Sequence, residues 1–268
     1  MLWIDGNVVD PAEPLDRGLE FGDGLFETLA VVAARPRLLE RHLARLGSGA
    51  QRLGIVLPAI ELVRRELASA AATPGTAVLK LVVTRGRGGR GYGAEPQAPS
   101  RRWLAALGAR VRPGEWQHDG VAVRICSTRL AEQPVLAGLK HLNRLEQVLA
   151  RREWVEPSIA EGLMLDLHGR LICGTMSNVF AVIDEVLVTP SLTRAGVAGV
   201  MRALFIDSFR AAGCAVQERD LEPVELESAS EVFLSNALIG AWPVRALAAQ
   251  CWPVGPWTRR AQEMVAAA

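Results

Sequence analysis

The chain has 268 residues, of which 50% are hydrophobic and 22% charged, and its formal net charge at pH 7 is +1. Such a composition indicates a globular protein with a sizeable core. The small net charge gives no electrostatic basis for binding nucleic acid or an anionic membrane. No stretch approaches the roughly 20 apolar residues of a membrane span, and the first residues lack the features of a signal peptide. We therefore expect a cytoplasmic protein without nucleic-acid or membrane partners.

The four cysteines, at positions 126, 173, 214 and 251, show no C-x-x-C spacing. This arrangement argues against a zinc site or a disulfide framework. We predict free thiols and no metal.

In the first half of the chain, the alternation of residues 2–9 around Asp5-Gly6 predicts a hairpin. A glycine-punctuated segment, residues 16–24, leads into a predicted strand at 25–32. Its pattern Gly18-x-x-x-Gly22-x-Gly24 is not followed by a helical pattern and is not read as a dinucleotide site. Apolar residues three and four apart then predict a core-facing helix at 39–53. Further elements follow in this order: a helix at 60–72, a strand at 77–84, a glycine-rich and arginine-rich loop at 85–92, and a strand at 103–111.

The polar, turn-rich stretch 113–118 is the best candidate for a domain boundary. After it the sequence predicts a strand at 121–127, a helix in the second half of 136–154, hairpin-like strands within 163–188, a helix at 197–212, a strand at 231–234 and a helix from 257. Because strands and helices do not alternate regularly, we favour an α+β fold over a doubly wound one. We predict a smaller N-terminal domain at 1–112 and a larger C-terminal domain at 119–268.

Lys140 is the most informative cation in the chain. Of the 30 basic residues only Lys80 and Lys140 are lysines, and the other 28 are arginines. A lysine can become a neutral amine that acts as nucleophile or base, whereas an arginine stays protonated. Lys140 directly precedes the amphipathic pattern of Leu142, Leu145, Val148 and Leu149. A solvated lysine at a helix start is the alternative, and Lys80 is the rival lysine, on the strand face that also carries Val78 and Val82.

Three other patterns suit the binding of oxyanions. His42 and Arg45 lie three apart on a predicted helix, and a guanidinium can bind a phosphate monoester through two parallel hydrogen bonds. The small residues of 196–202 open a helix whose free N–H groups can seat a phosphate. Arg90 and Tyr92 lie in a glycine-rich loop and could hold a carboxylate. The alternatives are a solvated helix flank, an ordinary helix start and a mobile surface loop.

In this order the patterns resemble the fold-type IV pyridoxal-phosphate enzymes, which include branched-chain and D-amino-acid aminotransferases and 4-amino-4-deoxychorismate lyase. The resemblance covers essentially the whole chain. The segments that match it are Phe21–Thr28, His42–Leu46, Lys140–Leu145, Gly174–Phe180 and Gly196–Arg202. Three further segments are most similar to the lyase branch, namely Arg85–Tyr92, Leu139–Gln147 and Ser235–Leu238.

The resemblance implies a two-lobed, D-amino-acid aminotransferase-like fold and a homodimer with its sites between the lobes. It implies pyridoxal 5'-phosphate as the cofactor and Lys140, in the C-terminal domain, as the catalytic lysine to which the cofactor is attached. The positions that match the family's cofactor site are Arg45, Arg144, Cys173, Val200 and Met201. The positions that match its substrate site are Phe26, Arg90, Tyr92 and Asn236.

One position departs from the family pattern. Cys173 stands where these enzymes usually have a glutamate that pairs with the pyridine nitrogen of the cofactor. A neutral thiol cannot keep this nitrogen protonated, which disfavours transamination more than an elimination driven by aromatisation. We therefore expect a lyase that converts 4-amino-4-deoxychorismate to 4-aminobenzoate and pyruvate for folate synthesis. A D-amino-acid or branched-chain aminotransferase, or an impaired member of the family, is the alternative.

Overall fold

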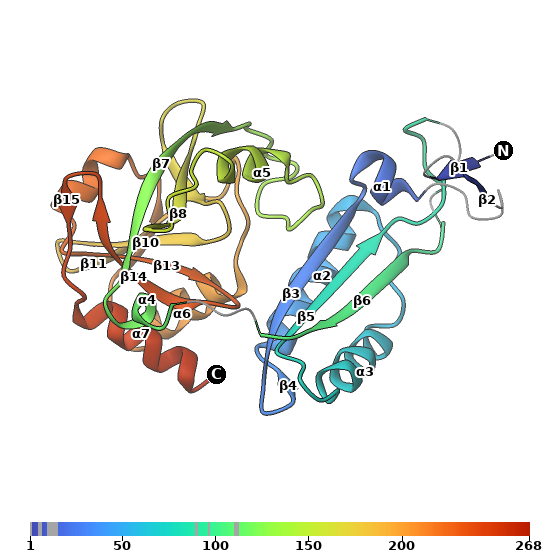
Figure 1. Ribbon diagram of the computed structural model, residues 1–268, viewed down its shortest axis with the longest axis horizontal. Helices are drawn as coiled ribbons and strands as arrows, with labels where there is room; N and C mark the ends of the chain where they lie inside the picture. The colour runs from blue at the N-terminus through green and yellow to red at the C-terminus, as the bar shows by residue number, and fades with distance from the viewer. Residues whose placement is uncertain (1, 5–6, 10–15, 89–90, 96, 110–112) are drawn as a thin grey trace.

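The structure is a computed structural model that describes the chain except for residues 1, 5–6, 10–15, 89–90, 96 and 110–112. Its described residues form two lobes, each built around its own sheet (Figure 1). A separate antiparallel pair, β1 (Leu2–Ile4) and β2 (Asn7–Val9), confirms the two strands of the predicted N-terminal hairpin, whose turn at Asp5-Gly6 lies outside the described residues. None of the described helices is long and apolar enough to cross a membrane.

The N-terminal lobe contains an antiparallel sheet with the strand order β4-β3-β5-β6. Its strands are β3 (Gly24–Val32), β4 (Arg35–Pro36), β5 (Val78–Thr84) and β6 (Arg101–Leu107), and its helices are α1 (Arg17–Phe21), α2 (Leu39–Leu53) and α3 (Ile60–Ala71). Leucines from alternate positions of β3 and β5 pack against the apolar sides of α2 and α3 to form the core. Since side chains alternate along a strand, the other face of the sheet presents Phe26, Lys80 and Val82.

The C-terminal lobe contains a mixed sheet with the order β12-β11-β10-β13-β14-β7-β8-β9, and β15 pairs with β14. Its strands are β7 (Val121–Leu130), β8 (Ile159–Asp166), β9 (Leu171–Gly174), β10 (Asn178–Ile183), β11 (Val186–Pro190), β12 (Val216–Arg219), β13 (Glu231–Asn236), β14 (Gly240–Leu247) and β15 (Gln250–Cys251). The helical elements are α4 (Glu115–His118), α5 (Leu145–Arg151), α6 (Val200–Ala211), the 3-10 helix η1 (Pro223–Ser228) and α7 (Pro256–Ala266). One face of this sheet packs its phenylalanines against α6 and α7, and the other face forms a second core.

Several predicted elements differ from the structure in their limits. The helix expected at 197–212 begins at Val200, and the strand expected at 103–111 spans Arg101–Leu107, its predicted end at 110–111 lying outside the described residues. The turn-rich stretch 113–118 contains the short helix α4. Strand β14 was not predicted, and it contains Pro243, a residue that is uncommon in the middle of a strand. In the structure Pro243 lies opposite Phe233 in an antiparallel pair.

The apolar side of α5 faces outward. Leu145, Val148 and Leu149 are 75%, 51% and 52% exposed, whereas Ala150 is buried. The sequence pattern correctly placed these three apolar residues on one side of the helix, but Leu142, the fourth residue of the pattern, precedes α5 and is not part of it. In a single chain, however, this side has no core to pack against, because α5 uses its opposite side to contact β7 and β8.

Candidate active site

The segment that carries Lys140 is held by both lobes. Toward the N-terminal lobe, the N–H of Phe26 donates to the carbonyl oxygen of Lys140 at 3.0 Å, and Leu142 N–H donates to the carbonyl of Gly24 at 3.0 Å. Toward the C-terminal lobe, Gly138 exchanges backbone hydrogen bonds with Gly196 and Ala198, both 3.0 Å long. Gly138 has φ of +80°, a left-handed conformation that favours glycine. The lysine therefore lies where the two lobes meet.

The amine of Lys140 loses its proton more readily than the amine of an ordinary lysine. Its Nζ lies 4.1 Å from the centre of the Phe26 ring. Burial is the largest cause that lowers the pKa of Lys140 to about 7, and the positive charge of Arg45 is the second largest. Near neutral pH a large share of this lysine is therefore a free amine, the form that acts as nucleophile or base.

Lys80 is part of the same site. Its Nζ lies 6.0 Å from the centre of the Phe26 ring, so the only two lysines of the chain flank one aromatic side chain. The predicted alternation of β5 is confirmed, because Lys80 is exposed while its neighbours Leu79 and Leu81 are buried. From the sequence alone, Lys80 was only a rival to Lys140. The scarcity of lysine was the signal that could have placed both residues in the site.

Arg45 projects from α2 toward the start of α6. Its guanidinium donates to the carbonyl oxygen of Ala198 at 3.0 Å. It also donates to both carboxylate oxygens of Glu27, at 2.8 and 2.5 Å, and Nδ1 of His42 lies 2.6 Å from Glu27. His42 and Glu27 are only 1% and 2% exposed. The alternative reading of His42 and Arg45 as a solvated helix flank is therefore wrong.

Sequence reasoning missed Glu27, which fixes the orientation of Arg45. Burial would raise the pKa of this carboxyl, but hydrogen bonds from His42 and Arg45 hold it below its ordinary value. Burial also lowers the pKa of His42, which favours the neutral imidazole. The alternation of β3 alone places Glu27 on the leucine-rich face of the strand, where a charged residue requires a partner. A charged residue on this apolar face was the sequence feature that could have identified Glu27.

The start of α6 forms an anion seat together with Arg45. Val200 and Met201 are the first residues of the helix, so their N–H groups have no intrahelical acceptor. The N-cap is Gly199, and no acceptor for these two N–H groups occurs within the described part of the chain. Both residues are buried. Unpaired, buried N–H groups at the positive end of a helix dipole, beside a guanidinium, fit a phosphate group.

Cys173 lies in β9 and is buried. Burial and the nearby carboxylate of Glu161 raise the pKa of Cys173 to about 12, while the cation of Arg144 acts in the opposite direction. Arg144 donates through Nε to the carbonyl of His141 at 2.9 Å, at the end of the lysine segment. The thiol is therefore protonated, and Arg144 is close enough to act on it electrostatically.

Glu161 does not substitute for the glutamate that Cys173 replaces. It accepts five hydrogen bonds, from the N–H groups of Gly162, Thr175 and Met176 and from the hydroxyls of Thr175 and Ser177. These contacts fix the turn that follows Cys173 and occupy both oxygens of the carboxylate. Glu161 is therefore a structural residue of this turn.

The predicted substrate residues that the structure describes lie in different surroundings. Phe26 lies beside both lysines. Asn236 donates through Nδ2 to the carbonyl of Met176 at 3.0 Å and accepts from Leu238 N–H at 2.8 Å, so it ties the end of β13 to the turn after Cys173. Tyr92 is 87% exposed and meets the Phe21 ring edge-on, with 5.3 Å between the ring centres. Arg90 lies outside the described residues.

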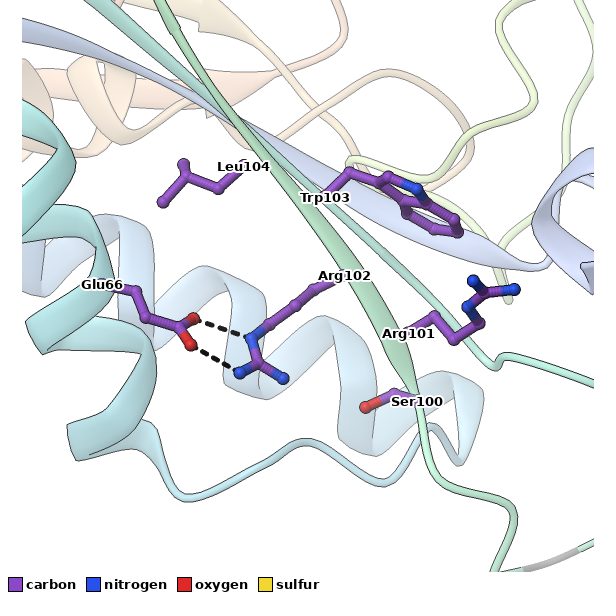
Figure 2. A pocket seen from close by; sticks show the side chains of 6 residues that line it. All are labelled: Glu66, Ser100, Arg101, Arg102, Trp103 and Leu104. Carbon is purple, nitrogen blue, oxygen red and sulfur yellow. Dashed lines mark hydrogen bonds and ion pairs between the residues drawn. The ribbon is translucent and has the colours of Figure 1, made fainter.

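A hollow of about 440 Å³ along β6 is a separate feature (Figure 2). The guanidinium of Arg102 and the carboxylate of Glu66 pair there at 2.7 and 2.5 Å, so their charges are already satisfied. Figure 2 shows Trp103 and Arg101 on the other side of the strand, with the guanidinium 5.5 Å from the ring centre. The hollow has no residue in common with the Lys140 site.

The comparison with known families agrees with this geometry. A family model described as amino-transferase class IV matches residues 24–247. The chain belongs to this family. It is 34% identical over 266 residues to an aminodeoxychorismate lyase of Vibrio harveyi, covering 98% of each chain. It is 28% identical to a putative branched-chain-amino-acid aminotransferase of Methanocaldococcus jannaschii, covering 91% of this chain and 86% of the relative.

Solved structures confirm the predicted α+β fold of the fold-type IV enzymes. The 4-amino-4-deoxychorismate lyase of Pseudomonas aeruginosa is 51% identical, with a TM-score of 0.91 and coverage of 98% of this chain and 97% of that one. The branched-chain amino acid aminotransferase of Escherichia coli shares the fold at 24% identity, with a TM-score of 0.80 and coverage of 97% and 91%.

The residues present fit pyridoxal 5'-phosphate. A phosphate group suits the seat made by Arg45 and the N–H groups of Val200 and Met201. An aldehyde needs a neutral amine such as that of Lys140. Arg144 directly follows the lysine segment and acts electrostatically on Cys173.

Proposed function

We propose that the protein is an aminodeoxychorismate lyase, which converts 4-amino-4-deoxychorismate to 4-aminobenzoate and pyruvate in the synthesis of folate. The observation that carries this proposal is the half-buried Lys140, whose pKa is lowered to about 7, in a chain 51% identical to the Pseudomonas aeruginosa lyase over nearly its full length. Pyridoxal phosphate is its cofactor. Arg45, Val200 and Met201 bind the phosphate, and Arg144 and Cys173 lie near the ring.

Lys140 performs the proton transfers. When bound, pyridoxal phosphate supplies an electron-withdrawing group that acidifies the carbon bearing the substrate amine. The neutral amine of Lys140 removes the proton from this carbon, and the enolpyruvyl ether leaves as the ring becomes aromatic. The resulting ammonium of Lys140 then returns the proton to the leaving group, which becomes pyruvate. One lysine beside both atoms provides the proximity that each transfer needs.

Lys80 binds the substrate, and Tyr92 is assigned to it by its match to the family. The substrate carries two carboxylates, and Lys80 offers an exposed ammonium beside Phe26, on the open face of the sheet. A charge-assisted hydrogen bond to a carboxylate is about twice as strong as a neutral one. Arg90 is assigned to the second carboxylate, and Asn236 is assigned to the substrate site by its match to the family.

Product analysis tests this function. The purified protein with pyridoxal phosphate is incubated with 4-amino-4-deoxychorismate, and 4-aminobenzoate and pyruvate are quantified by chromatography. We expect the two products in equal amounts. A parallel incubation with D- or L-amino acids and 2-oxoglutarate measures glutamate formation. Rapid glutamate formation without 4-aminobenzoate would show that the protein is an aminotransferase and not a lyase.

We also propose that the protein is a cytoplasmic homodimer with domains at 1–112 and 119–268. The apolar side of α5, formed by Leu145, Val148 and Leu149, supports the dimer because it is exposed in the single chain and borders the lysine segment. A second copy that covers this face would also close the site against water. The free thiols of all four cysteines suit a reducing compartment.

Light scattering after size exclusion tests the dimer. Val148→Glu places a charge in the centre of the apolar side of α5, and Val155→Glu places one at an 89% exposed position just beyond it. We expect wild type and Val155→Glu to be dimers and Val148→Glu to dissociate. A monomeric wild type, or a dimer that tolerates Val148→Glu, would refute this interface.

A further inference from the structure

The segment Asp16–Gly24 has no role in the chemistry described above, yet it contains the buried arginine Arg17, which is 4% exposed. Its guanidinium donates to three successive backbone carbonyl oxygens, those of Gly91, Tyr92 and Gly93, at 3.1, 2.9 and 3.0 Å. A guanidinium presents its donors in a rigid, planar fork, so it can hold three carbonyls of one bend at fixed positions.

The same arginine is anchored on its other side. Its Nε donates to Asp23 at 2.9 Å, and Asp23 accepts from Arg85 at 2.7 Å, at the start of the loop whose later residues Arg17 holds. Burial would raise the pKa of Asp23, but the two arginines lower it below its ordinary value, so the carboxylate stays charged. One carboxylate thus connects Arg85, through Arg17, to the bend at 91–93.

Packing around Arg17 is equally specific. Its guanidinium carbon lies 5.0 Å from the centre of the Phe21 ring, and the same ring meets Tyr92 edge-on. A side chain at Gly88 would lie 2.6 Å from Cδ of Arg17, so the glycine allows the loop backbone to cross the arginine closely. Tyr92 itself is left exposed, available to a ligand.

We propose that Arg17 is a positioning residue for substrate binding, which fixes the 91–93 bend so that Tyr92 is presented in one orientation. Arg17 does not touch the substrate and acts through the backbone of the loop. This inference rests on the proposed function, which assigns Tyr92 to the substrate. The conformation of the 91–93 bend thus depends on Arg17, which precedes Tyr92 by 75 residues.

The chain offers a direct probe, because Tyr92 is its only tyrosine. Protein labelled with 3-fluorotyrosine gives a single ¹⁹F resonance that reports the surroundings of Tyr92 without requiring activity. We compare wild type, Arg17→Ala and Arg17→Lys. The lysine variant keeps the charge beside Asp23 but cannot span three carbonyls, and it serves if the alanine variant fails to fold. The control is Arg102→Ala, which removes an ion pair with Glu66 of α3, on the helix-covered face of the same sheet.

We expect the Arg17 variants to shift the ¹⁹F resonance toward that of unfolded protein and to raise the KM for 4-amino-4-deoxychorismate about tenfold or more, with kcat changed less. The control and the affinity for pyridoxal phosphate should stay near wild type. An unchanged resonance, or a shifted resonance with an unchanged KM, would overturn the proposal. If wild type lacked lyase turnover, the proposed function would fail, while the resonance would still decide whether Arg17 holds the loop.

Discussion

Lys140 and Phe26 are joined both through the backbone and through their side chains. The N–H of Phe26 donates to the carbonyl of Lys140 at 3.0 Å, and Nζ of Lys140 lies 4.1 Å from the centre of the Phe26 ring. Strand β3 therefore fixes the position of the lysine and at the same time supplies the apolar surface that desolvates its amine. The reactivity of a residue in one lobe is thus set by a strand of the other.

Replacement of Lys140 should abolish both the covalent link to the cofactor and turnover. Lys140→Ala removes the amine, and Lys140→Arg keeps a positive charge but offers no usable free base. Borohydride reduction followed by peptide mapping identifies the labelled lysine in wild type. We expect the label on Lys140, and label on Lys80 would assign the roles of the two lysines the other way round. Lys80→Met should instead retain the cofactor and raise the KM.

The reactivity of Lys140 in the cofactor-free protein should depend on pH with a midpoint near 7, where its lowered pKa lies. Below this pH the amine is protonated and unreactive, and above it the neutral amine accumulates. Competitive acetylation followed by mass spectrometry measures this midpoint for each lysine separately. A midpoint near the ordinary lysine value of about 10.4 would show that the amine is not desolvated.

Two substitutions should move this midpoint in opposite directions. Arg45→Gln removes a neighbouring positive charge and should raise the pKa of Lys140, whereas Glu27→Gln removes a negative charge and should lower it. Arg41→Gln, on the same helix but in an exposed ion pair with Asp207, is the control and should leave the midpoint unchanged. Shifts of the same sign in both test variants would contradict the electrostatic account.

Arg45→Ala should weaken the binding of pyridoxal phosphate. The loss of one charge-assisted contact costs on the order of 1.5–3 kcal/mol, which corresponds to a roughly 10–100-fold weaker affinity. Fluorescence titration of the cofactor-free protein measures this affinity, and added cofactor should restore part of the activity. Arg41→Ala is the matched control. Equal affinity for pyridoxal phosphate in the two variants would show that Arg45 does not bind the phosphate.

Local patterns in the sequence predicted most of the fold, because the leucine spacing of α2 and the alternation of β5 directly reflect burial. They could not predict partners that are distant in sequence. Glu27 meets Arg45, and Arg17 meets Tyr92, only after β3, α2 and β5 have packed together. The apolar side of α5 shows a second limit of sequence-based prediction. The periodicity identified an apolar surface, but it could not tell whether the same chain or a second copy covers that surface.

Cys173 is expected to restrict the reaction to elimination. Its thiol is protonated, and the nearby carboxylate of Glu161 is occupied by five hydrogen bonds, so neither offers a negative charge to the cofactor ring. Transamination needs a strongly electron-withdrawing ring to stabilise a carbanion, whereas aromatisation drives the lyase reaction forward.

Cys173→Glu should therefore raise transamination while changing lyase turnover only modestly. Arg144 lies close enough to offer a counter-charge to the new carboxylate. Cys173→Gln is the matched control, because glutamine has nearly the same volume as glutamate but no charge. The two measurements are the steady-state rate of 4-aminobenzoate formation and the rate of pyridoxamine-phosphate formation with D- or L-alanine. If Glu and Gln variants transaminate equally, the charge at this position does not control the choice of reaction. A wild-type protein that transaminates rapidly without lyase activity would contradict both this role and the proposed function.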